Sequence, residues 1–221
     1  MGTIVAVVAV AAVFSCGAYW AMQQQKQRTT ALQALARHQG WAFHDHPPLA
    51  VVGHPSRWHL FTGGRGQRVR NHAAGTRDGR PVAVFDYAYT TGSGRTQHTW
   101  RQTVVQVRVP GRELPAFELR PENVFHKVGG MFGYQDIDVE GDAAFSGQYL
   151  LRGVDEAAIR ALFDAEVRDF YGRRPRCCTE AAGEDLFFWR TGKVTRPGDV
   201  PALVDEAMEL AGRLGRAGAA A

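Results

Sequence analysis

The sequence predicts an α+β protein, in which one N-terminal transmembrane helix precedes a single domain of antiparallel strands with two C-terminal amphipathic helices. The segment 4–22, IVAVVAVAAVFSCGAYWAM, is almost continuously apolar. Residues 68–109 alternate apolar and polar side chains with the period of strands, and the residues after 155 change to the period of helices. Strands followed by helices favour an α+β domain over a parallel sheet.

The apolar segment is long enough to cross a bilayer. As a helix it reaches about 28 Å, close to the ~30 Å hydrocarbon core of a membrane. No charged side chain occurs in residues 1–25, and the polar run QQQKQR follows the segment. We therefore expect membrane lipid to contact residues 4–22. The predicted boundaries are an anchor with its basic flank over 1–28, a soluble domain over 29–216 and a frayed tail over 217–221.

Two alternatives to a retained spanning helix stay open. A cleaved secretory signal needs a basic segment before the apolar run and a small-x-small site after it, and the start MGTIV has no basic side chain. A lipoprotein is the second alternative, because residues 13–16 (VFSC) loosely resemble a lipobox ending at Cys16. The bulky Phe14 fits that motif poorly.

The residues that flank the segment predict its orientation. Lys26, Arg28 and Arg37 follow the apolar run, whereas only the α-amino group precedes it. The positive-inside rule then places the domain in the cytoplasm, at the cell membrane, with a single pass. Tyr19 and Trp20 lie at the same end, where amphipathic rings favour the membrane interface.

Composition and cysteines exclude several classes of protein. The net charge is +4, but the basic residues are scattered and form no nucleic-acid motif, so we expect no nucleic-acid partner. Three cysteines make no disulfide framework. Cys177 and Cys178 are adjacent and lack the C-x-x-C spacing of a redox or zinc site. We expect one of these thiols to pack inward and the other to lie at the surface of a strand.

The elements of the domain follow in order. A helix continues over 29–39 and stops at Gly40, and a glycine-rich loop over 53–66 carries Trp58, Leu60 and Phe61 as anchors to the core. The expected strands are 68–76, 82–89, 96–109, 116–120, 136–140 and 145–151, with a hairpin of 177–181 and 186–191. In the second strand Ala83, Phe85, Tyr87 and Tyr89 share one face, and Val82, Val84, Asp86 and Ala88 share the other.

Two helices complete the domain. Asp155 is a good N-cap for a helix ending at Gly172, and a second helix begins near Asp199. The apolar stripe of the first is Ile159, Leu162, Phe163, Val167 and Phe170; that of the second is Leu203, Val204, Ala207, Ala211 and Leu214.

The glycine and histidine clusters favour structural roles. Residues 63–66 and 92–95 are glycine-rich, but neither opens a helix as a phosphate-binding loop does, so we expect turns. Four histidines, at positions 44, 46, 54 and 59, provide enough ligands for a metal. No H-E-x-x-H or similar spacing fixes their geometry, and surface or packing positions are expected.

Two groups of carboxylates are the remaining candidates. Asp136, Asp138 and Glu140 alternate along a predicted strand, which places them on one face for cation binding or acid–base chemistry, although an exposed strand face is the commoner case. Asp86 interrupts an apolar strand face. A buried Asp86 needs a cation, for which Arg101 or Arg108 of the neighbouring strand are the expected partners, and a structural ion pair is favoured over a catalytic acid. No G-x-S-x-G motif occurs. We assign no catalytic, cofactor-binding or metal-binding residue.

A set of short segments occurs in one order along the chain: Gly40-Trp41, Arg57-Trp58, Arg68-Val69-Arg70-Asn71, Phe85-Asp86-Tyr87 with Tyr89, Thr91-Gly92-Ser93-Gly94, Leu119-Arg120-Pro121-Glu122, Asp136-Ile137, Phe145 and Glu184-Asp185-Leu186-Phe187. As a set, these segments resemble a family of uncharacterised bacterial proteins that is common in actinobacteria. They cover nearly all of 40–192. The resemblance implies an N-terminal membrane helix with one α+β domain, and it transfers no catalytic residue because the family has no established activity.

The sequence thus favours a membrane-tethered, non-enzymatic binding or scaffolding domain without a cofactor. The alternative from a different class is a membrane-anchored, cation-dependent hydrolase that uses Asp86 or the face of Asp136, Asp138 and Glu140. Convergence of those carboxylates with His44 or His54 in one cleft would favour the hydrolase.

Overall fold

The computed structural model describes residues 2–122, 135–138 and 143–217, and the side chains of the first helix from Cys16 onward with the exception of Ala18. The helices are α1 (Gly2–His38), α2 (His59–Thr62), α4 (Ala143–Ser146), α5 (Glu156–Leu162), α6 (Ala165–Arg173) and α7 (Val200–Arg216). The strands are β1 (Ala42–His44), β2 (Arg65–Arg77), β3 (Arg80–Thr91), β4 (His98–Arg108), β5 (Leu114–Pro121), β6 (Gln135–Asp136), β7 (Tyr149–Gly153), β8 (Cys178–Gly183) and β9 (Asp185–Trp189).

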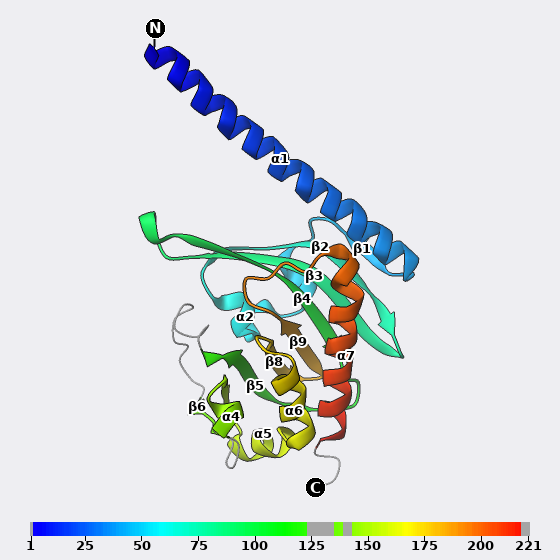
Figure 1. Cartoon of the computed structure of the whole chain (residues 1–221). Coiled ribbons are helices and arrows are strands. Elements are labelled where there is room, and N and C mark those ends of the chain that lie inside the picture. The colour runs from blue at the N-terminus through cyan, green and yellow to red at the C-terminus, as the bar shows by residue number, and fades with distance from the viewer. Residues whose placement is uncertain (1, 123–134, 139–142, 218–221) are drawn as a thin grey trace.

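The described strands form one nine-stranded sheet with the order β1-β2-β3-β4-β9-β8-β5-β7-β6. Every neighbouring pair is antiparallel. The long strands β2, β3 and β4 make one half of the sheet, and β5 to β9 make the other (Figure 1). The predicted α+β domain of antiparallel strands with C-terminal helices is therefore confirmed.

Helices cover one face of the sheet. The largest apolar cluster joins α5, α6 and α7 to inward-facing residues of the strands. Among these, Val105, Phe117 and Phe188 are fully buried. The same layer continues across β1 and β2 through Leu32 and Ala36 of α1. Beyond this packed end, α1 projects away from the domain (Figure 1).

A short irregular segment covers the opposite face. It comprises the 3-10 turns η1 (Leu49–Val52) and η2 (Pro55–Arg57) together with α2. Trp58, Leu60 and Phe61 are buried against the aromatic side chains of β3 and β9, as the sequence predicts. The Trp58 ring packs edge-on against Phe187 at 4.7 Å between centroids. Both faces of the central strands are thus covered, and the two sets of side chains predicted for β3 separate into two clusters.

One glycine permits a close approach between α1 and the sheet edge. A Cβ atom at Gly75 of β2 would lie 2.1 Å from the ring of Trp41, the residue that precedes β1. Trp41 is buried and its Nε1 donates to the carbonyl oxygen of Thr76 at 3.3 Å. Any larger side chain at position 75 would therefore displace the tryptophan that closes the chain reversal after α1.

Three predicted elements differ from the structure. The single helix expected from 155 to 172 is two helices, because Asp164 caps a second one and accepts from the backbone N–H of Val167 at 2.9 Å. The strand expected over 145–151 begins at Tyr149, and Phe145 belongs to α4. The strand expected over 136–140 is described only as β6, and Glu140 lies outside the described residues.

In the part of the chain that the structure describes, no helix is long and apolar enough to cross a membrane. Most of the segment 4–22 lies outside the residues whose side chains are described.

Candidate functional site

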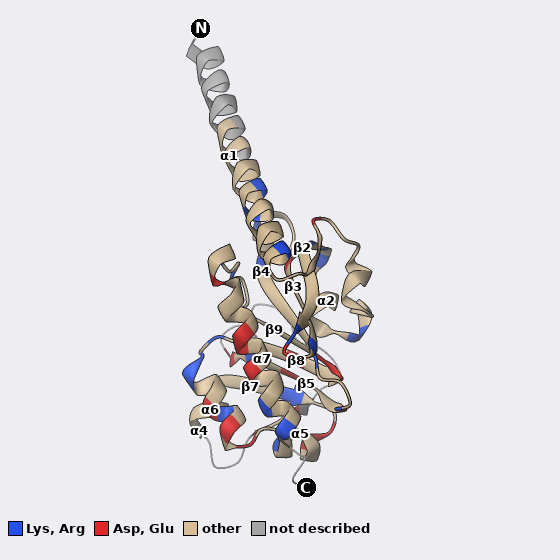
Figure 2. Ribbon diagram, turned by 90° about the vertical axis from the view of Figure 1, so that its right-hand side faces the viewer, with Lys and Arg blue, Asp and Glu red and all other residues tan. Residues whose placement is uncertain are grey.

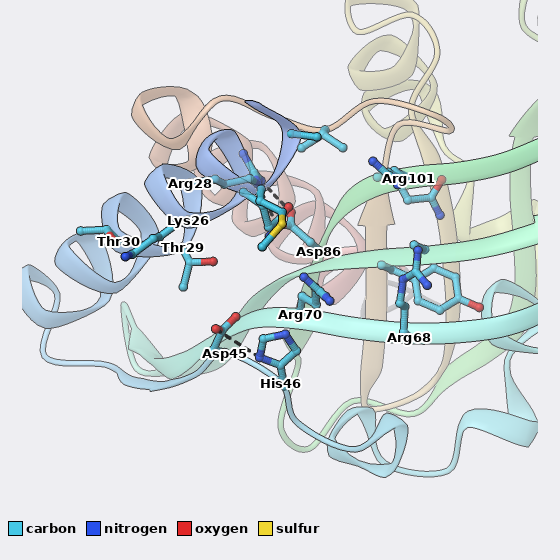
Figure 3. A pocket seen from close by; sticks show the side chains of 17 residues that line it. Lys26, Arg28, Thr29, Thr30, Asp45, His46, Arg68, Arg70, Asp86 and Arg101 are labelled. Atoms are coloured by element: carbon cyan, nitrogen blue, oxygen red, sulfur yellow. Dashed lines mark hydrogen bonds and ion pairs between the residues drawn. The ribbon is translucent and has the colours of Figure 1, made fainter. Parts of the chain in front are cut away.

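A pocket of about 850 Å³ lies where α1 meets the face of β2, β3 and β4 (Figure 3). Residues 21–30 of α1 form one wall, and Asp45 and His46 close one side. The floor comes from the three strands, and Val194 contributes from the segment before α7. Figure 2 shows the basic residues of α1 on the part of the helix that reaches these strands.

Asp86 fixes α1 to the floor of this pocket. Arg28 donates from Nε to Asp86 Oδ2 at 2.7 Å and from Nη2 to Oδ1 at 2.6 Å, which makes a bidentate ion pair. Nη1 of Arg28 also donates to the carbonyl oxygen of Thr195 at 2.6 Å. The two side chains are only 13% and 15% exposed. Such a charge-assisted pair is stronger than a surface ion pair because water screens it less.

Two further residues complete the hydrogen bonding of Asp86. Nδ2 of Asn71 donates to Oδ2 at 2.8 Å, and the hydroxyl of Thr103 donates to Oδ1 at 3.1 Å. Asn71 lies at a register shift in β2 with φ of 51°, a left-handed conformation that asparagine tolerates better than most residues. The bulge turns the Asn71 side chain toward Asp86, so the carboxylate is held by three elements.

The prediction that Asp86 forms an ion pair is therefore confirmed, but the predicted partners, Arg101 or Arg108, were wrong. Arg108 bonds instead to Glu184 at 2.9 Å, and Arg101 lines the pocket without a carboxylate. The neighbouring strand is a reasonable source of a cation, but the register places Thr103 opposite Asp86. Arg28 reaches it from 58 residues earlier in the chain, a contact for which the sequence carries no local signal.

The floor of the pocket is basic because of its strand register. Arg68 of β2 lies opposite Ala88 of β3, and Ala88 lies opposite Arg101 of β4, so the three residues form one row on the face that α1 covers. In the adjacent row Arg70 lies opposite Asp86. Five cationic side chains and two carboxylates line the pocket, with Lys26 on the α1 wall.

The other carboxylate candidates do not join this site. Asp136 on β6 pairs with Arg152 of β7, and Asp138 is exposed. The strands β6 and β3 lie six positions apart in the sheet order. The two groups of carboxylates in the hydrolase hypothesis therefore occupy separate places, and neither His44 nor His54 lines the pocket. That hypothesis stays a prediction that no observed contact favours.

The histidines are dispersed as well. His46 contacts Asp45 at 3.1 Å, whereas His59 packs on the opposite face of the sheet. Burial, with a smaller effect from His44, lowers the pKa of His72 to about 4. No group of three or more His, Cys, Asp or Glu side chains suited to a metal ion occurs among the described residues.

A second polar cluster, which sequence reasoning missed, lies under α2. Glu118 of β5 and Glu180 of β8 are directly opposite in the sheet and almost fully buried. Glu180 accepts from the backbone N–H groups of His59 and Leu60 at 2.6 and 2.8 Å, while Nδ1 of His59 lies 3.1 Å from Glu118. Arg120 pairs with Glu118. In the sequence, the available signal for this cluster was the alternation of side chains along β5 and β8, which carry Glu118 and Glu180.

The pKa values of this cluster follow from burial and mutual contact. Burial, and then the charge of Glu118, raise the pKa of Glu180 to about 7. The hydrogen bond with Glu118 raises the pKa of His59 against the effect of burial. Burial alone would raise the pKa of Glu118, but the bond to His59 and the charge of Arg120 lower it. The cluster attaches the segment over 53–62 to the sheet, which is a structural role.

Both strand cysteines are buried, so the expectation of one surface thiol was wrong. Burial raises the pKa of Cys177 to about 12 and also raises that of Cys178. The surface position was expected because neighbours on a strand face opposite sides, but helices cover one side here and the α2 segment covers the other. A thiol with a raised pKa is a poor nucleophile.

Comparison with known proteins identifies one similar solved structure. No protein-family model and no curated protein sequence matches the chain. The crystal structure of the mycobacterial trehalose monomycolate transport factor A, TtfA, is similar with a TM-score of 0.60 and 12% sequence identity. The match covers 86% of this chain and 93% of that one. At this identity the likeness shows a shared fold. Its mycobacterial source agrees with the actinobacterial resemblance seen in the sequence.

Proposed function

We propose that this chain is a membrane-tethered, non-enzymatic binding protein whose site is the pocket between α1 and strands β2 to β4. The observation that carries the proposal is the continuity of α1. The helix that contains the apolar segment 4–22 also supplies one pocket wall through residues 21–30. Arg28 attaches that wall to the sheet, so the proposed tether and the site belong to one continuous helix that is bonded to the domain.

The exposed side chains next to the pocket support a membrane position. Tyr19, Trp20 and Met22 are 65%, 66% and 71% exposed. Of these, tyrosine and tryptophan, whose large apolar rings carry a polar group, are typical of the boundary between lipid and water. Lys26 and Arg28 follow within two turns, and this favours a cytoplasmic domain under the positive-inside rule.

The chemistry of the pocket supports binding over catalysis. Both oxygens of Asp86 accept hydrogen bonds from Arg28 and from a second side chain, so this carboxylate has no free position for a proton in transfer. The similar structure is named a transport factor, and a role in which the domain binds a ligand or partner at the membrane agrees with that name.

The tether is tested by fractionation and reporter fusions of the full chain. We expect the protein to stay in the membrane fraction after an alkaline carbonate wash. Green fluorescent protein fused after Ala221 should fluoresce, and alkaline phosphatase fused there should be inactive. Release by carbonate would contradict the tether, and phosphatase activity would reverse the orientation. A mature protein that begins at a lipid-modified Cys16 would replace the spanning helix by a lipid anchor.

A further inference from the structure

The pocket contains cations that no carboxylate neutralises. Asp86 is engaged by Arg28, and Asp45 contacts His46. Within the described ranges, the side chains of Lys26, Arg68, Arg70 and Arg101 have neither an ion-pair nor a hydrogen-bond partner. Several other arginines of the domain are paired, as Arg77, Arg174 and Arg190 are with Asp205, Glu209 and Glu206. Four like charges around one hollow repel each other unless an anion joins them.

The geometry of the floor fits an anion with several oxygens. Arg68 and Arg101 stand on either side of Ala88, two strand spacings or about 10 Å apart at their Cα atoms. The small side chain of Ala88 leaves room between them, and both guanidinium groups are long enough to meet over it. Figure 3 shows Arg68 and Arg70 on β2 and Arg101 on β4, along the same pocket.

A phosphate group matches this arrangement better than a carboxylate does. A carboxylate presents two oxygens in one plane and satisfies one guanidinium fork. A phosphate presents oxygens in several directions, so guanidinium groups that approach from different strands can each form a bidentate contact. Lys26, a compact point charge on α1, can neutralise the same group from the opposite wall.

The position along α1 indicates where such a group would be met. Residues 21 and 22 belong to both the apolar segment and the pocket lining. Lys26 follows Met22 by four residues, about 6 Å along the helix axis. The lipid headgroups occupy several ångströms on each side of the hydrocarbon core. If the segment 4–22 spans the membrane, the pocket lies at the level of the headgroups.

We infer that the pocket binds a phosphate-bearing anion between Arg68 and Arg101, above Ala88, with Arg70 and Lys26 neutralising its remaining charge. The inference rests on the proposed function because it names the ligand class of the same site. A membrane phospholipid and a soluble phosphate ester share this chemistry, and the experiment separates them.

Binding is measured by isothermal titration calorimetry with the full chain in a non-ionic detergent. The probes are phosphatidylglycerol, glycerol 3-phosphate and a phosphate-free galactosyl diacylglycerol. We expect phosphatidylglycerol to bind and the galactolipid not to bind. Affinity for phosphatidylglycerol at least tenfold above that for glycerol 3-phosphate identifies a lipid ligand, and equal affinities identify a soluble phosphate ester. Both results support the site.

Matched variants locate the site. Arg68→Gln and Arg101→Gln each remove a charge-assisted contact, so we expect each to weaken binding by about tenfold or more. Both residues lack partners in the described structure, so the variants should keep the melting temperature of the unmodified chain. Arg95→Gln is the control, because Arg95 is an exposed arginine in the hairpin between β3 and β4 that does not line the pocket.

The inference is overturned if neither phosphate probe binds with a dissociation constant below about 1 mM, or if the galactolipid binds as well as phosphatidylglycerol. It is also overturned if Arg95→Gln weakens binding as much as the two pocket variants. These failures leave the tether intact when the chain still fractionates with membranes. Conversely, a chain that binds glycerol 3-phosphate through Arg68 and Arg101 but is washed from membranes refutes the tether and keeps the anion site.

Discussion

At the residue scale, Asp86 carries the contact between α1 and the sheet. Its carboxylate receives two hydrogen bonds from Arg28, one from Asn71 and one from Thr103. Thr103 in turn accepts from the backbone N–H of Thr195 at 2.9 Å, so the segment before α7 joins the same network. Loss of one partner leaves the others partly desolvated and unpaired, which costs more than the pair itself contributes.

We predict that Asp86→Asn lowers the free energy of unfolding by about 1–3 kcal/mol, because an amide cannot accept all four of these bonds. Arg28→Gln should have a comparable effect, and the double variant should lose less than the sum of the two. Urea denaturation of the three variants measures this. An unchanged stability in Asp86→Asn would contradict a structural role for the carboxylate.

The buried pair of glutamates predicts a dependence of stability on pH. Glu180 has a pKa raised to about 7, so the folded protein holds a proton that the unfolded chain releases near its ordinary value of 4.5. The stability that Glu180 contributes should therefore be lost as pH rises from about 5 to about 7. His59, whose pKa is also raised, contributes a loss in the same direction above its ordinary value of 6.5. His72, whose pKa burial lowers to about 4, adds stability as pH rises from about 4 to 6.5 and offsets part of the loss that Glu180 causes. Glu118, whose pKa is lowered, acts only below about pH 4.5, where its contribution is lost.

Glu180→Gln should remove the loss that Glu180 causes between about pH 5 and 7, because the amide resembles the protonated acid and does not titrate. Relative to the unmodified chain, the stability of the variant should therefore increase with pH over that range. Chemical denaturation at a series of pH values measures the slope. Glu156→Gln is the control, since Glu156 forms an exposed ion pair with Arg160 on α5 that contributes little. An equal slope in the Glu180 variant and the unmodified chain would show that another group titrates.

At the scale of the elements, local patterns predicted most of the fold. Period-2 alternation identified β2, β3 and β4 to within three residues at each end. The apolar stripe predicted for α7 is confirmed, because all five of its residues are buried in the structure. The errors arose where tertiary context decides. Phe145 continues an apolar run but belongs to a one-turn helix, and a helical stripe that stays in phase across Asp164 concealed the break between α5 and α6.

The break between α5 and α6 leads to a prediction at Asp164. Asp164→Ala removes the side-chain acceptor for the N–H of Val167, and the free energy of unfolding should fall by about 1 kcal/mol. Asp164→Asn keeps an N-cap acceptor and should lose at most a few tenths of that. Thermal unfolding of both variants distinguishes them. Equal losses in the two would point to the charge of Asp164 rather than to capping.

The basic pocket could be predicted only in part, because it depends on several elements at once. The sequence shows Arg68, Arg70 and Arg101 on predicted strands, and their common face follows from strand alternation. It does not show that a helix starting at residue 2 returns Arg28 to Asp86 and so leaves Arg101 unpaired. The bulge at Asn71 could not be predicted from the sequence either, yet it sets the register of β2 beneath the pocket.

At the scale of the whole molecule, α1 is bonded to the domain, so the stability of the domain should depend on how much of α1 is present. Leu32 and Ala36 are buried in the main core, and Arg28, one turn earlier, makes the most N-terminal ion pair with the sheet among the side chains of α1 that the structure describes. We predict that a chain beginning at Gln23 unfolds at higher urea concentration than one beginning at Thr29. The free energies of unfolding of the two chains should differ by about 1–3 kcal/mol, since the shorter chain leaves Asp86 buried without its cation.

The reason for the difference is tested by Arg28→Gln in the longer chain. If the guanidinium group stabilises the domain, this variant should match the chain that begins at Thr29, even though the helical turn before it is present. If the turn itself contributes by extending α1, the variant should retain most of the stability of the longer chain. Equal stability of all three would show that Asp86 finds another cation, for which Arg70 is directly opposite on β2, and the attachment of α1 to the pocket would then be too weak to couple the site to a membrane.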